Sequence, residues 1–383
     1  MGSVFPLSRA ARSLRWDDPA PRRIGVFRAL MLGDLLCAVP ALRAIKAAHP
    51  QAELSLIGLP SAKALADRLS CVDRFIAFPG YPGLPEVEPD LAALPAFFSR
   101  MQAEQFDLLV QLHGSGSVVN AVVAACAPRH SAGFVEPSGT GAWCAEPALY
   151  TAWPDRGHEI ERLLAVTDHL GLKRQGLQLE FPITAHDREA LAQVWPDAYS
   201  AQPYVCVHAG AQLRSRRWMP ERFAAVADRL AAHGYSVVLT GTASEQPLVS
   251  QVATLMTQPA VSLAGRTTLW TLGALIECAQ LLVSNDTGVS HIASALRTRS
   301  VVVSSGADVK RWGPLDAELH RVIARDVACR PCAHESCPTG HECARSVSVD
   351  DVLAQVPASL LLNKPQGAPA STPHLRSEAH LNV

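Results

Sequence analysis

Short apolar runs alternate with longer segments of helical periodicity along the first half of the chain. Runs of this length, bounded by polar or turn residues, predict buried strands. Their alternation with helices is typical of βαβ units on a parallel sheet. The predicted strands of this half cover residues 24–28, 53–58, 74–78 and 107–112.

A second cycle of the same kind begins near Pro203. Its clearest helix starts at Pro220 and stops at Gly234, residue types that favour the first position of a helix and the position after its end. Three more helices are predicted, the first up to about residue 256 and the others over 268–279 and 288–297. The predicted strands of this half cover residues 204–210, 235–241, 261–265, 281–286 and 300–305.

Two successive Rossmann-like halves predict an α/β protein whose domains face each other across a cleft, because such folds bind ligands at the C-terminal ends of their strands. We expect an N-terminal domain over residues 22–182 and a C-terminal domain over 188–362, with the linker at 179–187. Residues 1–21 and 364–383 are predicted to be flexible tails, because Pro, Gly, Ser and His replace periodic apolar residues there.

The composition of the 383 residues, 48% hydrophobic and 18% charged, is typical of a compact protein. A net charge of −1 supplies no overall positive field, so nucleic acid is not an expected partner. The sequence contains no recognisable secretory signal and no apolar run of membrane-spanning length. We therefore expect a cytoplasmic protein whose ten cysteines are mainly thiols.

Asp34 lies directly after the first predicted strand, within the segment ALMLGDLLCAVPAL. This edge of the sheet is where α/β proteins hold their ligands, so the carboxylate is a candidate general base. The alternative is that Asp34 caps a helix N-terminus, a position that Asp favours. Pro40 complicates that alternative, because a helix starting at Leu35 would be kinked there.

A cluster of arginines follows the strand at 204–210, in the segment HAGAQLRSRRWMPERF. Guanidinium groups at a strand end can neutralise a diphosphate while its bond breaks. Arg214, Arg216 and Arg217 crowd this turn and are the candidates, and the alternative is a solvated basic loop. Trp218 next to them is interpreted as a packing residue.

The segment SNDTGVSHIASAL places a polar loop between a predicted strand and a predicted helix. Thr287 and Gly288 can present a hydroxyl and free backbone N–H groups to an anion. Asp286 is interpreted as the organiser of this loop, and His291 as a ligand-side residue or a buried structural histidine. Glu245, after another strand, is a candidate for binding a ribose diol or a solvated glutamate.

Four cysteines within a short segment near the C-terminus are candidate ligands for Zn²⁺ or iron. Their spacing departs from paired CxxC knuckles, so free thiols or a disulfide formed on oxidation remain alternatives. The four are Cys329, Cys332, Cys337 and Cys343.

HGSGSVVN at residues 113–120 contains a GxG after a strand, but Val119 occupies the place of the third glycine. The dinucleotide-binding fingerprint is therefore incomplete, and a dehydrogenase or epimerase is a weak interpretation. His113 and Gly114 are candidates for contact with an acceptor, since they lie at a strand end of the first domain.

Together these segments resemble glycosyltransferase family 9, the ADP-heptose:lipopolysaccharide heptosyltransferases and their relatives. LGDLLCAVPALRAIK is similar to the family's opening LGD…PAL stretch, HAGAQLRSRRWMPERF to its H-P-G-A…K-R-W…P-E-R-F segment, and SNDTGVSH to its N-D-T-G-x-x-H helix start. RWGP at 311–314 and the cysteine-rich tail also follow the family pattern. The resemblance spans residues 24–356.

The resemblance implies a GT-B fold and a metal-independent, inverting sugar transfer. It implies an acceptor bound by the first domain and an ADP-sugar bound by the second, with no cofactor needed for catalysis. Asp34 matches the family's catalytic aspartate and Arg216 its basic residue at the donor phosphate. The other expected donor contacts are Arg217, Glu245, Asp286, Thr287, Gly288 and His291.

The expected function is transfer of a heptose from ADP-heptose to a hydroxyl of a lipopolysaccharide-core-type acceptor. Its partners would be the nucleotide sugar and a lipid-linked saccharide at the inner membrane surface, which the protein would approach from the cytoplasm. The alternatives are a protein acceptor and a nucleotide-sugar-binding protein without activity. SSGADVKRWGP replaces the family's F-G-P-T-x-P-like turn beside the donor, so the nucleotide and sugar stay open.

Overall fold

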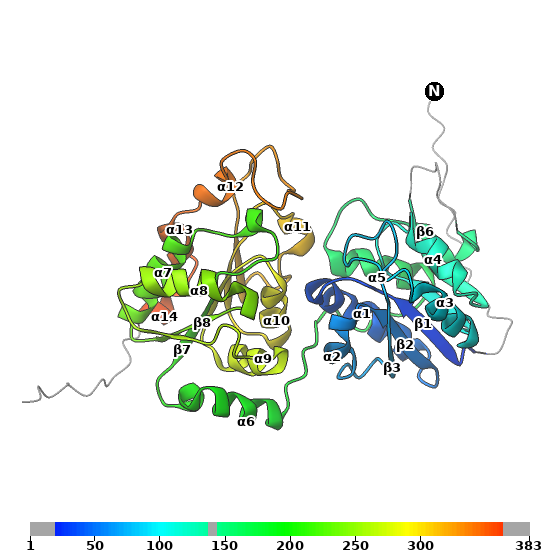
Figure 1. The fold of residues 1–383 in the computed structure, drawn as a ribbon, viewed down its shortest axis with the longest axis horizontal. Coiled ribbons are helices and arrows are strands. Elements are labelled where there is room, and N and C mark those ends of the chain that lie inside the picture. The colour runs from blue at the N-terminus through cyan, green and yellow to red at the C-terminus, as the bar shows by residue number, and fades with distance from the viewer. Residues whose placement is uncertain (1–19, 137–143, 363–383) are drawn as a thin grey trace, which may run out of the picture.

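Each half of the chain folds around a six-stranded, wholly parallel sheet. The computed structural model describes residues 20–136 and 144–362. Residues 1–19 of the predicted tail at 1–21, and all of the predicted tail at 364–383, therefore lie outside the described residues. Figure 1 shows the two lobes side by side, with helices on the faces of each sheet. This arrangement confirms the predicted fold class of two Rossmann-like domains.

The first lobe has the strand order β3-β2-β1-β4-β5-β6, the doubly wound order in which a ligand crevice opens between β1 and β4. Its strands are β1 (Arg23–Phe27), β2 (Glu53–Gly58), β3 (Arg74–Ala77), β4 (Leu108–Gln111), β5 (His130–Val135) and β6 (Tyr150–Ala152). Its helices are α1 (Leu32–Ala48), η1 (Pro60–Ala62), α2 (Lys63–Ala66), α3 (Leu94–Ala103), α4 (Val119–Ala125), η2 (Pro147–Leu149) and α5 (Glu159–His169).

The second lobe repeats this topology as β12-β11-β10-β7-β8-β9, so its crevice opens between β7 and β10. Its strands are β7 (Tyr204–His208), β8 (Ser236–Thr240), β9 (Ala260–Ser262), β10 (Leu282–Asn285), β11 (Ser300–Val303) and β12 (His320–Ile323). Its helices are α6 (Ala185–Val194), η3 (Pro196–Tyr199), η4 (Arg214–Arg216), α7 (Pro220–Ala232), η5 (Ala243–Glu245), α8 (Gln246–Leu255), α9 (Leu269–Cys278), α10 (Gly288–Leu296), α11 (Val309–Trp312), α12 (Glu342–Arg345), α13 (Val349–Leu353) and α14 (Ala358–Leu362).

Helix α1 begins at Leu32, earlier than the sequence suggested, and continues through Pro40. Proline costs the helix one backbone hydrogen bond. The helix face around Pro40 is buried from Leu35 to Leu42, and this burial offsets the loss. The early start places Asp34 in the first turn.

The lobes meet along α1 of the first and α10 of the second, which share one buried apolar cluster. Below them, α6 begins inside the predicted linker, with Thr184 and Asp187 forming a capping box. Arg68 of the first lobe pairs with Asp187 and lies 3.7 Å from the centre of the Trp270 ring. The connecting segment is thus packed against both lobes.

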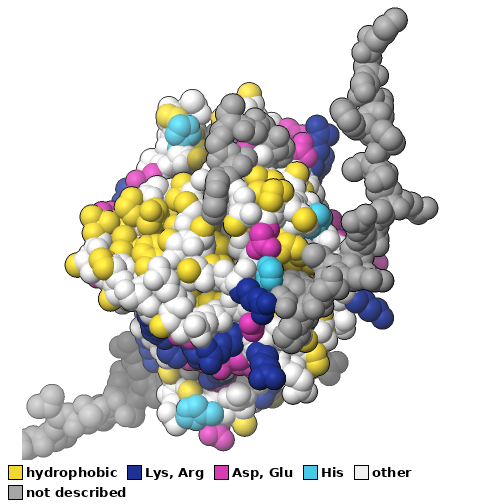
Figure 2. Space-filling view, turned by 90° about the vertical axis from the view of Figure 1, so that its right-hand side faces the viewer, with side chains coloured by type: hydrophobic (Ala, Val, Ile, Leu, Met, Phe, Trp, Pro, Cys, Tyr) yellow, Lys and Arg dark blue, Asp and Glu magenta, His cyan; other side chains and the backbone are white. Residues whose placement is uncertain are grey.

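Within the described residues, no helix is both long and apolar enough to cross a membrane. Figure 2 shows the end of the molecule formed by the first lobe, where hydrophobic side chains gather in one area and Lys and Arg in another. Leu91, before α3, is 61% exposed.

Candidate active site

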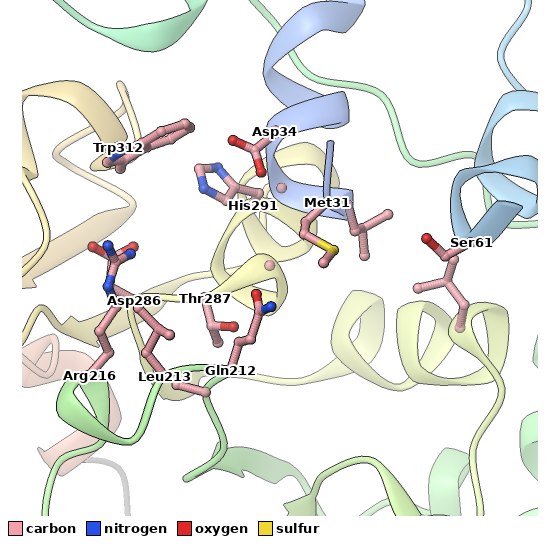
Figure 3. Close-up of a pocket in the computed structure, with 15 residues that line it drawn as sticks. Met31, Asp34, Ser61, Gln212, Leu213, Arg216, Asp286, Thr287, His291 and Trp312 are labelled. Atoms are coloured by element: carbon pink, nitrogen blue, oxygen red, sulfur yellow. The ribbon is translucent and has the colours of Figure 1, made fainter. Parts of the chain in front are cut away.

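A cavity of about 670 Å³ lies between the lobes, a size typical of sites for nucleotides and other small ligands. Its wall is built from the N-termini of α1 and α10, the loop around η4, and single residues of η1, α9 and α11 (Figure 3). The lining residues are Met31, Leu32, Gly33, Asp34, Ser61, Ala211, Gln212, Leu213, Arg216, Leu269, Asp286, Thr287, Gly288, His291 and Trp312.

The topology explains this position. The α1 segment follows β1, the η4 loop follows β7, and the residues before α10 follow β10. These strands border the crevices of the two sheets, where the chain connections diverge and leave room for a ligand. The cavity is the place at which the crevice of one lobe faces that of the other.

Asp34 projects from the first turn of α1 into this cavity and is half-buried. The helix is capped by Met31 without a side-chain hydrogen bond, so the alternative that Asp34 is the cap is wrong. Burial raises the pKa of Asp34 above its ordinary value of 3.8, against the opposing positive charge of Arg28. A carboxylate in this state is a stronger base than a solvated one.

His291 lies beside Asp34 in the first turns of α10 and is buried. Burial lowers the pKa of His291, which keeps the ring neutral near pH 7. A Cβ atom at Gly33 would be 2.8 Å from Cδ2 of His291, so only glycine fits there. The ring of His291 thus packs directly against the first turn of α1.

Arg216 reaches the cavity from η4, and its terminal nitrogen lies 3.3 Å from the carbonyl oxygen of Cys332. Its buried Nε atom has no hydrogen-bond partner among the described residues. Arg217 does not line the cavity; its Nε donates to the carbonyl of Ala211, 2.8 Å away. Trp218 is buried against Phe223, as the packing interpretation predicted.

The loop before α10 is held by hydrogen bonds to residues at the end of β11 and just after it. Asp286 accepts a hydrogen bond of 2.9 Å from the hydroxyl of Ser304, which leaves the loop's cavity side open. Thr287 is the N-cap residue, but its hydroxyl makes no capping bond. Gly288 opens the helix without a side chain, so backbone N–H groups at this end can face an anion.

Glu245 is placed outside the cavity wall. Its carboxylate accepts hydrogen bonds from Thr242 and lies 4.0 Å from Nε2 of His208. A Cβ atom at Gly210 would collide with it, so the carboxylate covers the loop that leads to Arg216. Glu245 therefore lies next to the cavity rather than within it, and its binding of a ribose diol stays a prediction.

His113 and Gly114 also lie outside the wall of this cavity. Nδ1 of His113 is 3.3 Å from the backbone nitrogen of Ala29, and Nε2 is 3.5 Å from Glu86. The histidine is 6% exposed, so its ring serves the packing of the first lobe. The structure brings neither residue to the position expected of an acceptor contact in this cavity.

The four C-terminal cysteines do not form the predicted metal site. Among the residues that the structure describes, no three His, Cys, Asp or Glu side chains are grouped as metal ligands. Cys343 belongs to α12 and is buried, whereas Cys329 is exposed, so the cysteines lie at different depths. They are free thiols in this structure.

Sequence reasoning missed several residues that shape the site. Asn285 is buried and bonds the backbone of Trp218 and of Ala209, which ties the arginine loop to β10. Ser61 lines the cavity from a segment without a recognised motif, and Trp312 lines it from the RWGP segment, whose resemblance to the family assigned this residue no role. Asn285 is part of the N-D-T-G motif. Its role was missed because residue spacing does not indicate which neighbouring loop the side-chain amide of an asparagine will bind.

Two Rossmann-like lobes that face each other across a cavity form the arrangement called GT-B, and an acid on one side with an arginine on the other suits a glycosyltransferase. A sequence profile of glycosyltransferase family 9 (heptosyltransferase) matches residues 95–342. The chain belongs to this family, as its sequence motifs predicted, and it is a glycosyltransferase.

Relatives of known name agree with this family. Lipopolysaccharide heptosyltransferase 3 of Escherichia coli is 31% identical over 173 residues, 44% of this chain and 51% of the relative. The protein of the same name from strain K12 is 23% identical over 88% of this chain and 97% of its own length. The first match thus spans about half of the relative, and the second nearly all of it.

Solved structures show the same fold. The family 9 glycosyltransferase of Veillonella parvula superimposes with a TM-score of 0.72 at 18% identity, over 89% of this chain and 97% of that one. The ADP-heptose lps heptosyltransferase II of E. coli gives a TM-score of 0.70 at 19% identity, over 88% and 98%.

Proposed function

We propose that this chain transfers a heptose from ADP-heptose to a hydroxyl group of a lipopolysaccharide-core-type acceptor, with inversion at the anomeric carbon. The observation that carries the proposal is the meeting of Asp34 with the N-terminus of α10 and Arg216 in one cavity. A base and an anion-binding surface on opposite lobes suit a displacement in which one bond forms as another breaks. The names of the relatives supply the heptose and the lipopolysaccharide acceptor class, and the name of the E. coli heptosyltransferase II supplies ADP-heptose as the donor.

Asp34 would accept the proton of the acceptor hydroxyl as its oxygen attacks the anomeric carbon. The bond from that carbon to the diphosphate oxygen breaks, and the electron pair leaves with ADP. Arg216 and the N–H groups at Gly288 would stabilise the growing negative charge, since both residues line the cavity. Contact between the lobes excludes water that would otherwise hydrolyse the donor.

The test is a transfer assay with ADP-heptose and a heptose-terminated core oligosaccharide, read by mass spectrometry. ADP-, GDP-, UDP- and TDP-sugars are compared by thermal shift to identify the donor. Asp34→Asn should abolish transfer while the affinity for ADP stays within about twofold, because Asn keeps the shape of the side chain but cannot accept the proton.

Normal turnover by Asp34→Asn would overturn the assignment of the base. Binding of the donor by the unchanged protein without transfer or slow hydrolysis would identify a non-catalytic nucleotide-sugar-binding protein instead. Transfer to a polypeptide but not to the oligosaccharide would replace the proposed acceptor.

For the acceptor, we propose a lipid-linked saccharide that the protein meets at the inner face of the inner membrane. The exposed hydrophobic and basic areas at the end of the first lobe support this proposal, because both can contact a membrane surface (Figure 2). Co-sedimentation with anionic vesicles should exceed that with zwitterionic vesicles, and equal recovery in the supernatant of both would contradict it.

A further inference from the structure

A second contact between the lobes lies beside the cavity, and it is formed by residues that have no role in the proposed reaction. At the N-terminus of α5, His158 and Glu159 face the RWGP segment of the second lobe. Nε2 of His158 is 2.7 Å from the carbonyl oxygen of Gly313, and Oε2 of Glu159 is 2.7 Å from Nε of Arg311. Two consecutive residues of one lobe thus bind two nearly consecutive residues of the other.

His158 can make both of its ring hydrogen bonds only as the neutral tautomer with the proton on Nε2. Its Nδ1 accepts a hydrogen bond from the backbone N–H of Ile160, so the ring proton resides on Nε2 and points to Gly313. Burial lowers the pKa of His158, which favours this neutral form. Between the two bonded positions, Trp312 turns towards the cavity and lines it.

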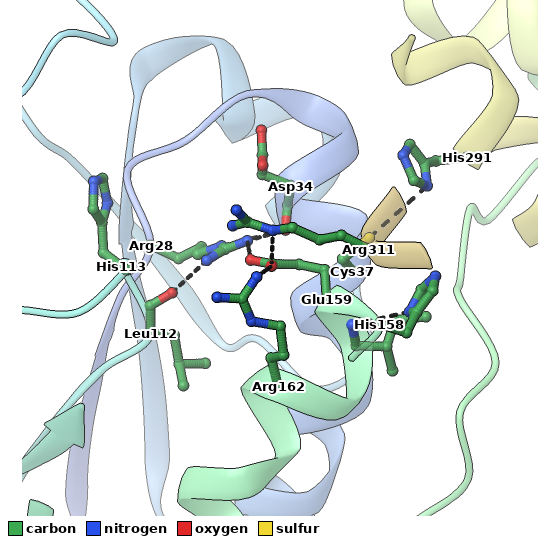
Figure 4. Close-up of polar contacts among 12 residues, drawn as sticks. Arg28, Asp34, Cys37, Leu112, His113, His158, Glu159, Arg162, His291 and Arg311 are labelled. Atoms are coloured by element: carbon green, nitrogen blue, oxygen red, sulfur yellow. Dashed lines mark hydrogen bonds and ion pairs between the residues drawn. The ribbon is translucent and has the colours of Figure 1, made fainter. Parts of the chain in front are cut away.

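Glu159 is 1% exposed and is surrounded by guanidinium groups. Oε1 binds Arg28 at 3.1 Å, Oε2 binds Arg311, and Arg162 lies 3.8 Å away. Figure 4 shows the three arginines converging on this one carboxylate. A buried carboxylate is retained at such a position only when its partners compensate for the loss of water, so the arrangement is costly to disturb.

Arg28 continues the connection to the proposed base. It is fully buried, and its Nε and terminal nitrogen lie 3.3 and 3.0 Å from the backbone carbonyl oxygen of Asp34. It also donates to the carbonyl of Leu112 at the end of β4. The position of Asp34 is therefore coupled through Arg28 and Glu159 to a residue of the opposite lobe.

We propose that His158, Glu159, Arg311 and Gly313 form an inter-lobe clasp, with Glu159 as a positioning residue that couples closure of the lobes to the placement of Asp34. This inference rests on the proposed function of Asp34 as the base. When the clasp is closed, Arg311 is bound to Glu159, and Trp312 forms part of the cavity wall. When the lobes separate, Arg311 no longer binds Glu159 and becomes solvated, and water can reach the donor.

The first variant is Arg311→Gln, because Arg311 is 33% exposed, belongs to the second lobe, and leaves Glu159 its ion pair with Arg28. We expect kcat to fall about tenfold, within the usual range of coupling between sites. KM for the donor should change less, since Arg311 does not line the cavity. The ratio of donor hydrolysis to transfer should rise, because water enters the open site.

The matched control is Arg188→Gln. Arg188 makes two hydrogen bonds of 2.7 Å to Glu277. The variant therefore loses an ion pair as well bonded as that of Arg311. This pair joins α6 to α9, and neither of its residues lines the cavity. Both kcat and the hydrolysis ratio should match those of the unchanged protein. If Arg311→Gln behaves like this control, the contact does not couple closure of the lobes to the placement of Asp34.

A pH profile separates positioning from a general loss of structure. The charged and titratable groups that face Asp34 are Arg28 of β1's end, Glu159 of α5, His291 of α10 and Arg311 of α11. Removing a cation disfavours the ionised carboxylate, so Arg311→Gln should move the acid limb of kcat to higher pH. Removing an anion does the opposite, so Glu159→Gln should move it to lower pH. Shifts in the same direction would overturn the coupling.

Amide hydrogen exchange tests whether the clasp forms, independently of any catalytic activity. In Arg311→Gln, amides of residues 160–163 and 309–313 should exchange about tenfold faster than in the unchanged protein or in Arg188→Gln. If the unchanged protein transfers no sugar, the proposed function is wrong. The hydrogen-exchange rates still show whether the contact between α5 and the RWGP segment forms. Unchanged exchange in both segments would refute the clasp even in an active enzyme.

Discussion

The raised pKa of Asp34 has a consequence for stability as well as for chemistry. Its folded-state pKa lies above the unfolded value, so the folded protein binds this proton more tightly, and ionisation at higher pH costs stability. Asp34→Asn removes that cost. Its Tm should exceed that of the unchanged protein by about 2 °C at pH 8, and the difference should shrink towards pH 4. Differential scanning calorimetry at both pH values measures this.

Asp67→Asn is the control for that measurement. Asp67 is exposed and pairs with Lys63 across one helical turn, an interaction worth little in water. Its Tm should change by less than about 1 °C at either pH. A lower Tm for Asp34→Asn at pH 8 would show that the carboxylate is stabilised in the folded protein and would remove the argument for a strengthened base.

Arg216 and Arg214 make a matched pair on η4. Arg216 lines the cavity with an unpartnered buried Nε, whereas Arg214 is exposed. Since hydrogen bonds to charged groups contribute about 1.5–3 kcal/mol, Arg216→Ala should weaken ADP binding roughly tenfold to a hundredfold. It should also lower the rate of transfer. Arg214→Ala should leave the affinity within about twofold, and isothermal titration calorimetry with ADP compares the two.

At the scale of elements, the N-termini of α1 and α10 meet closely. A Cβ atom added to Gly33 would lie 2.8 Å from His291, whereas one added to Gly288 would meet only ordinary contacts of 3.8 Å or more. Gly33→Ala should therefore force the helices apart and destabilise the protein by about 1–3 kcal/mol, as overpacking does. Urea unfolding measures the change.

The cause of that loss can be isolated by a double-mutant cycle with His291→Ala. Because the clash involves the histidine ring, Gly33→Ala should cost at least about 1 kcal/mol less in the His291→Ala background. Gly288→Ala should show no such coupling to His291. Additive effects of Gly33→Ala and His291→Ala would mean that the two helices do not meet through these residues.

At the scale of the whole molecule, the sequence predicted the fold more fully than the site. Strands with strong apolar runs, such as β1 and β10, were predicted nearly at their bounds because a buried strand needs apolar residues on both faces. β5, β6 and β12 were missed because Gly, His, Ser, Thr and Arg interrupt their apolar pattern. Their places in the sheets come from neighbouring strands.

The site was predicted where a strand end and a polar motif coincide. Asp34, Arg216 and Thr287 all fulfil this condition, and the structure brings them to one cavity. Arg28 and Glu159 do not, since the ion pair joins residues 131 positions apart and neither lies in a recognisable motif. Such a pair depends on how the lobes pack, which local patterns do not encode.

Packing between the lobes also determines how the molecule unfolds. The buried apolar cluster of α1 continues into α10, and the ion pair of Arg68 with Asp187 joins the first lobe to α6. Lobes with such a shared core cannot unfold independently without exposing it. We therefore expect a single calorimetric transition, with the van't Hoff enthalpy equal to the measured one. ADP should move the entire transition to higher temperature, because it binds only the folded protein. Two resolved transitions, with ADP shifting one alone, would show that the shared core does not couple the lobes.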